Sequence, residues 1–414
     1  MEKLKKNNLL VFYFLVIFSL TCSIYVFFNL PIVDTQPVYY ELAKSLLNKD
    51  YIIDKAYSSS HIKSFYSFGY PAFISGYIFG DIDMTLRVIQ FFSLMSVYVI
   101  TLYNHSKNKN FELFIGNHFS DRNFWWIFFW VFFLLFHPYF ILNITRVTDT
   151  TLALFCITIL FSLIVNRFNY NKIYIFIAGF VLGLFIGIRP NSILLLLLFV
   201  YFLYKNYICK SQYLIFLLTT FFTYILFSHL ITGELFFWPS QGGYTLFAGN
   251  NPFSYSATKV FYNSERSIGQ AIEWCGIIGR DYYSISLTDY LNCTQKFFLN
   301  DFFGFCKNFI FKIYNLFFRP NLNPESLISA QGISLGIVEI FFKILIVIPA
   351  YIWWILFIFN RNFRNSFSVW YGALFIFTYC FLSIISLTDP RHSLPIDIIY
   401  IISSLNYKFK QLKH

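Results

Sequence analysis

The chain has 414 residues, of which 57% are hydrophobic and only 12% are charged, and its formal net charge is +11. A water-soluble protein of this length needs more charge to cover its surface, so the composition argues against a soluble fold. The basic residues sit in short loops between apolar runs, where they act as orientation signals rather than as a nucleic-acid surface. We therefore expect an all-α polytopic membrane protein that binds no nucleic acid.

Apolar runs of the length needed to cross a hydrocarbon core of about 30 Å recur along the whole chain. The first run is too long for a cleaved signal peptide, and no small-residue cleavage site follows it. The sequence predicts a bundle of about ten membrane spans, near residues 9–30, 84–103, 124–143, 148–165, 173–188, 191–204, 212–231, 334–358, 367–386 and 393–405.

The basic loops alternate with the predicted spans in a way that sets the topology. Lysine and arginine gather in six segments on one side, around residues 3–6, 107–122, 167–172, 205–210, 361–364 and 408–413. By the positive-inside rule this side is cytoplasmic, so both termini are expected there. The expected location is a bacterial inner (plasma) membrane, with the active site facing outward.

Two large segments then fall on the external side, residues 31–83 after the first span and residues 232–333 after the seventh. The second is long enough for a small subdomain or for several interfacial helices. We expect three regions. Residues 1–231 form a transmembrane catalytic module that includes the first external loop, residues 232–333 form the external segment, and residues 334–414 form C-terminal transmembrane helices.

Asp34 follows the first span, just where the chain is expected to leave the membrane. Pro37 suits a first helical turn, and apolar residues then repeat at the i, i+3, i+4, i+7 spacing of a helix lying in the interface plane: Tyr39, Leu42, Ala43 and Leu46. A carboxylate held at the mouth of an external cavity can act as general base towards a hydroxyl. The alternative is a helix-capping or interface carboxylate.

Three arginines occupy external turns where orientation does not explain them: Arg146, Arg189 and Arg391. An arginine near the membrane rim is costly unless it snorkels or has a partner. Planar guanidinium donors match phosphate oxygens, so an anionic lipid phosphate is one partner. The alternative is a snorkelling arginine paired with Asp149 or Asp389 in its own turn.

The seven cysteines form no metal-binding pattern, and no nucleotide or zinc motif occurs. Cys275, Cys293 and Cys306 share the second external segment. One disulfide can form there if the segment is extracytoplasmic, but the spacing does not choose the pair.

Spaced elements over nearly the whole chain resemble the integral-membrane glycosyltransferases of the C superfamily, in particular the bacterial family related to protein O-mannosyltransferases and to the lipid A aminoarabinose transferase. The matching elements, in chain order, are Asp34 with Tyr39 or Tyr40, Ala43 and Leu46; Gly69, Tyr70 and Pro71; Asp149; Gly183, Gly187 and Arg189; the stretch from Gly242 to Pro252 with Tyr244 and Asn250; and Arg391 with Pro395.

This resemblance implies transfer of a sugar from a polyprenyl-phosphate carrier to an acceptor hydroxyl on a lipid, glycan or protein, with inversion at the anomeric carbon. It implies catalytic roles for Asp34 and Asp149, donor-phosphate contacts for Arg146, Arg189 and Arg391, and substrate contacts for Tyr39, Tyr70, Tyr244 and Asn250.

Many members of the family have a second acidic residue after the first, where this chain has Thr35. The use of a divalent metal therefore stays open, and no cofactor is expected with certainty. Two alternative functions also stay open, a lipid-linked glycan polymerase or ligase and a flippase or transporter for lipid-linked sugars. Matched repeats and broken helices at the midplane, which are common in transporters, are not evident.

Overall fold

The computed structural model describes residues 2–32, 37–47, 68–75, 80–106, 141–145, 147–165, 172–205, 210–233, 235, 246–247, 249–253, 264–277 and 285–318. Within these ranges the chain forms α-helices and short 3-10 helices and no strand, which confirms the all-helical prediction for this part. The predicted spans near 334–358, 367–386 and 393–405 lie outside the described residues, as does nearly all of the one near 124–143.

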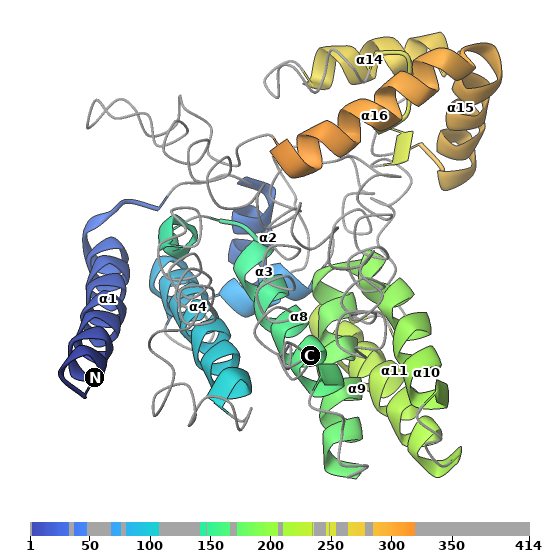
Figure 1. Cartoon of the computed structure of the whole chain (residues 1–414). Coiled ribbons are helices and arrows are strands. Elements are labelled where there is room, and N and C mark those ends of the chain that lie inside the picture. The colour runs from blue at the N-terminus through green and yellow to red at the C-terminus, as the bar shows by residue number, and fades with distance from the viewer. Residues whose placement is uncertain are drawn as a thin grey trace, which may run out of the picture.

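Helices occupy six of the predicted spans and the predicted interfacial segment after the first span (Figure 1). Their bounds are α1 Glu2–Asn29, α2 Pro37–Leu47, α3 Gly69–Ile74, α4 Ile82–Ser106, η2 Asn143–Thr145, α8 Thr150–Val165, α9 Lys172–Ile188, η3 Pro190–Ile193, α10 Leu194–Lys205 and α11 Lys210–Thr232. Three more helices lie within residues 232–333, the part that the sequence predicts to be external and that we call the external segment: α14 Ser264–Trp274, α15 Leu287–Asn300 and α16 Phe302–Phe318.

Two of these helices contain a stretch long and apolar enough to cross a membrane, Ile82–Ile100 of α4 and Ser211–Thr232 of α11. The apolar stretches of α1, α8 and α9 are shorter: Ile17–Asn29, Thr150–Leu163 and Lys172–Ile188. A helix needs about 20 apolar residues to cross the hydrocarbon core unaided. Length and composition therefore identify two candidate spans among the described helices, fewer than the sequence predicted for the same region.

Helix α9 packs closely against α11 because glycines line one side of α9. A Cβ atom on Gly179 would lie 2.8 Å from the backbone oxygen of Phe216, and one on Gly183 would lie 2.6 Å from that of Thr220. Side chains do not fit at such distances, so only glycine permits this approach of the two backbones. Helix α8 contacts both α9 and α4, which extends the packed layer towards α1.

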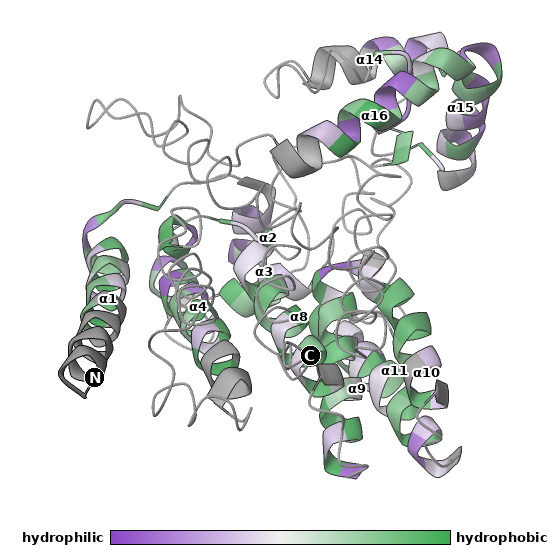
Figure 2. Cartoon of the chain, viewed as in Figure 1, coloured by the Kyte–Doolittle hydropathy of each residue, from purple (hydrophilic) through white to green (hydrophobic). Residues whose placement is uncertain are grey.

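The main hydrophobic core joins residues of α1–α4 and α8–α11. Large apolar side chains also cover the outer faces of these helices, among them Phe28, Phe222 and Leu230. A second, smaller core lies in the external segment and includes Phe247, Ile272 and Tyr290. Figure 2 shows the difference between the two parts, since α8–α11 are mainly hydrophobic whereas α14–α16 carry more hydrophilic residues.

Candidate functional site

The central feature of the site is a bidentate ion pair between Arg189 and Asp149. The Nε of Arg189 donates to Oδ2 of Asp149 at 2.7 Å, and its Nη2 donates to Oδ1 at 2.8 Å. Only 12% of the Arg189 side chain and 10% of the Asp149 side chain are exposed. Charge-assisted bonds of this fork geometry fix the plane of the guanidinium. The pair joins two turns that the sequence analysis treated as separate.

The local structure places each charge at a favourable helix end. Asp149 directly precedes α8, and its carbonyl accepts the first helical bond from the amide of Ala153 at 2.9 Å. Arg189 directly follows α9, where its amide donates to the carbonyl of Phe185 at 2.7 Å. A negative charge is stabilised near a helix N-terminus and a positive charge near a C-terminus. Two helix ends therefore support the same ion pair.

Tyr70 and Gln90 form a buried polar contact close to the ion pair. The Nε2 of Gln90 donates to the Tyr70 hydroxyl at 3.0 Å and to the carbonyl of Thr148 at 2.7 Å. Burial, and then the charge of Asp149, raise the pKa of Tyr70 well above its ordinary value. The Tyr70 hydroxyl therefore keeps its proton at all physiological pH values and can serve as a hydrogen-bond donor.

Helix α3 brings Tyr70 to this position because Gly69 lies against the end of α9. A Cβ atom on Gly69 would lie 2.6 Å from the backbone carbon of Gly187, two residues before Arg189. The ring of Tyr39 from α2 packs edge-on against the ring of Tyr70, with centroids 5.3 Å apart. Two predicted substrate residues, Tyr39 and Tyr70, thus lie side by side, and Tyr70 is the one close to Asp149.

The first turns of α4 hold the chain on both sides of residues 33–36. Before this stretch, Nη2 of Arg87 donates to the carbonyl of Leu30 at 2.7 Å and its Nη1 donates to the carbonyl of Phe27. After the stretch, the hydroxyl of Tyr40 donates to the carboxylate of Asp83. Arg87 was not predicted from the sequence. The sequence did contain a clue to Arg87. It lies near the predicted external end of a span, where the positive-inside rule does not call for an arginine.

Asn250 lies in a second polar cluster, within the external segment. Nζ of Lys312 on α16 donates to Oδ1 of Asn250 at 2.8 Å, and Nδ2 of Asn250 donates to the carbonyl of Leu246 at 2.7 Å. Nδ2 of Asn308 donates to the carbonyl of Asn251 at 3.2 Å. Burial lowers the pKa of Lys312 to about 7. The polar atoms of Asn250 thus bind the protein itself, and the buried Lys312 is a residue that the sequence analysis missed.

The structure joins Cys275 to Cys293 in a disulfide, which links the end of α14 to α15. Cys306 of α16 is a free thiol. The pair that the sequence left open is therefore Cys275–Cys293. No group of three or more His, Cys, Asp or Glu that could hold a metal ion occurs among the described residues.

Four predicted site residues lie outside the described residues: Asp34, Arg146, Tyr244 and Arg391. Of the others, the structure brings together Asp149, Arg189, Tyr39 and Tyr70. Asp149 pairs with Arg189, which comes from a different turn of the chain, whereas Arg146, the arginine in its own turn, lies outside the described residues. Gly69 lets α3 approach the end of α9, and α8 contacts α9 directly, which brings the two turns together.

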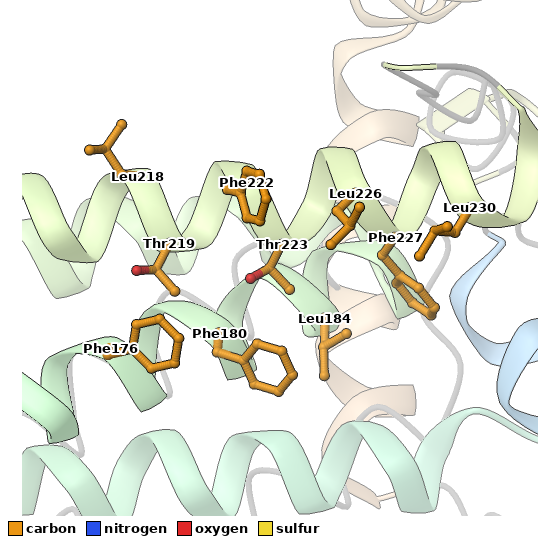
Figure 3. A pocket seen from close by; sticks show the side chains of 10 residues that line it. All are labelled: Phe176, Phe180, Leu184, Leu218, Thr219, Phe222, Thr223, Leu226, Phe227 and Leu230. Atoms are coloured by element: carbon orange, nitrogen blue, oxygen red, sulfur yellow. The ribbon is translucent and has the colours of Figure 1, made fainter.

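An apolar pocket of about 600 Å³ lies between α9 and α11 (Figure 3). Its lining is aromatic and aliphatic except for Thr219 and Thr223. At one end lies Phe227, whose ring contacts Phe68 with centroids 5.3 Å apart, next to Gly187. The pocket has no charged lining and therefore suits a hydrocarbon rather than a sugar.

No protein-family model matches this chain, and no curated protein is significantly similar to it. The function is therefore inferred from the geometry of the site and from the resemblance of the spaced sequence elements.

Proposed function

We propose that the chain is a multi-pass membrane glycosyltransferase of about ten spans, which moves a sugar from a polyprenyl-phosphate carrier to an acceptor hydroxyl on the extracytoplasmic face of a bacterial plasma membrane. The observation that carries this proposal is the partly buried Arg189–Asp149 pair beside Tyr70. It places a fixed guanidinium and a protonated phenol together at one end of the helices. Such donors suit a phosphate and a sugar.

Sugar transfer forms one bond to the anomeric carbon and breaks another. The acceptor oxygen attacks the anomeric carbon, the bond from that carbon to the phosphate oxygen breaks, and its electron pair leaves with the polyprenyl phosphate. The proton of the acceptor hydroxyl passes to a carboxylate, for which we propose Asp34. Arg189 balances the charge that develops on the leaving phosphate.

Asp149 has a different role in this proposal. A carboxylate that accepts two bonds from a guanidinium favours its charged form and is a poor proton acceptor. Asp149 is therefore proposed to orient the Arg189 guanidinium rather than to act as the base. Arg87 and Asp83 are also proposed to have a positioning role, because they hold the chain on either side of residues 33–36.

The apolar pocket between α9 and α11 supports a lipid-borne donor rather than a soluble one. Its lining includes Phe227, which lies against Gly187, two residues before Arg189. In the proposal, the prenyl chain lies along this pocket while its phosphate meets Arg189. A soluble sugar nucleotide has no hydrocarbon chain that could occupy this pocket.

Donor binding by variants of Arg189 tests the proposal. Purified protein in nanodiscs is titrated with a panel of polyprenyl-phosphate sugars, and the dissociation constant is measured for the wild type, Arg189→Ala and Arg189→Lys. We expect a large loss of affinity in Arg189→Ala and a partial recovery in Arg189→Lys, which keeps the charge but loses the planar fork. Equal affinity of all three folded proteins for every donor would refute the assignment.

A further inference from the structure

Helix α16 turns its apolar face outward and its polar face inward. Phe303, Ile310 and Tyr314 are 85%, 67% and 54% exposed, whereas Asn308 and Lys312 are 6% and 3% exposed. At 3.6 residues per turn the first three share one face of the helix, and the last two lie on the opposite face. A helix on a water-facing surface has the reverse pattern.

The exposed apolar face continues beyond these three residues onto the end of α15. The rings of Phe298 and Phe302 meet at the corner between the two helices, with centroids 5.4 Å apart. We call the whole surface the α16 stripe, and its exposed residues are Phe298, Leu299, Phe302, Phe303, Phe309, Ile310 and Tyr314. Large exposed apolar patches of this kind mark a binding surface.

Charge and aromatic composition identify the partner. Lys307 is exposed beside the stripe, and the exposed Lys296 of α15 lies over the ring of Trp274, 4.8 Å from its centroid. Lysines beside a broad apolar face suit anionic lipid headgroups, and amphipathic tyrosine and tryptophan rings are typical of the membrane–water interface. Aromatic residues also occur at protein interfaces, but lysine is depleted there, so the two lysines favour lipid as the partner.

We propose that the α16 stripe rests on the lipid bilayer, at the boundary between headgroups and acyl chains. Helices α14–α16 lie beyond one end of the α8–α11 helices in Figure 1, where such a surface is expected. The stripe then meets lipid while Lys312 and Asn250 face away from it. The inference depends on the proposed membrane insertion, and it does not depend on sugar transfer.

Photolabelling from inside the bilayer tests this inference. The full chain is placed in nanodiscs of neutral and anionic phospholipids that carry a diazirine on the acyl chain, and adducts are mapped by mass spectrometry. A parallel sample is labelled with a water-soluble carbene reagent. We expect lipid adducts on Phe303, Ile310 and Tyr314 and none on Asn308 or Lys312.

Helix α11 serves as the internal standard, because Leu214 and Phe221 are exposed on this helix of membrane length and do not line the apolar pocket. Lipid adducts on α11 but only aqueous adducts on the stripe would overturn the inference and leave membrane insertion standing. Protection of the stripe from both reagents would also overturn it, since a protein partner or a second copy would then cover the stripe. An unlabelled α11 would instead contradict membrane insertion itself.

Two charge-introducing variants sharpen the test. Phe303→Glu and Ile310→Glu should each lower lipid labelling of residues 298–314 without changing the labelling of α11, because a charge in the apolar boundary is unfavourable. Gln295→Glu is the matched control, since it adds the same charge at an exposed polar position of α15. An equal loss of labelling in all three variants would refute a specific lipid contact of the stripe.

Discussion

The Arg189–Asp149 pair should be strongly coupled in stability. Removing one partner of a buried ion pair costs about 3–5 kcal/mol, because the other charge is left without compensation. Two charge-assisted bonds at 2.7 Å and 2.8 Å, with nearly all of both side chains covered, place this pair in that class. Arg189→Met and Asp149→Leu should therefore each lower the free energy of unfolding by about this amount.

The double variant Arg189→Met/Asp149→Leu should cost far less than the sum of the two single variants. Replacing both partners by apolar side chains leaves no buried charge and is often neutral. The assay is denaturant unfolding of the purified protein in detergent micelles. Glu41→Gln is the control, because Glu41 and Lys44 form a pair with 51% and 49% of their side chains exposed, worth at most about 1 kcal/mol. Additive costs in the double variant would refute the coupling.

Three further predictions concern close packing, titration and the disulfide. Gly69→Ala should destabilise the fold by about 1–3 kcal/mol, because its Cβ would meet the backbone of Gly187. The control is Gly269→Ala, which has open space around it and should be neutral or stabilising. Thermal unfolding measures both variants. Since burial lowers the pKa of Lys312 to about 7, the unfolded chain binds more protons between pH 7 and the ordinary lysine pKa of about 10.4. Stability should therefore rise with pH in that range by up to about 1.4 kcal/mol per pH unit, and a Lys312→Met variant with the same pH profile as the wild type would contradict this. Replacing Cys275 and Cys293 together by alanine should lower the stability of the external segment by about 2–4 kcal/mol, measured by limited proteolysis against a Cys306→Ala control.

The sequence predicts the helices well where hydrophobic periodicity is strong. In α2 the four apolar residues of the predicted face, Tyr39, Leu42, Ala43 and Leu46, are all buried. Tyr70, Asp149 and Arg189 were also selected from sequence, through the order of motifs along the chain. In each case a local pattern or a familiar spacing carries the information.

The pairing of site residues could not be read from the sequence, because it depends on how helices pack. Asp149 has Arg146 in its own turn, and nothing local favours the distant Arg189 as its partner. The pair forms because α8 and α9 pack against each other, a contact that the local sequence does not specify. Lys312 was missed for a related reason, since a lysine in an apolar helix is expected to point outward, whereas here the apolar side chains do so.

Turnover by carboxylate variants shows whether Asp34 accepts the proton of the acceptor hydroxyl. Release of polyprenyl phosphate is measured with purified wild type, Asp34→Asn and Asp149→Asn, together with donor affinity. The account predicts that Asp34→Asn loses about 10²–10⁴-fold in turnover with donor affinity kept, because the amide cannot accept the acceptor proton. Asp149→Asn should mainly weaken donor binding through a misplaced Arg189. Full turnover in a folded Asp34→Asn protein, as expected for a helix cap in which asparagine replaces aspartate well, would contradict the account.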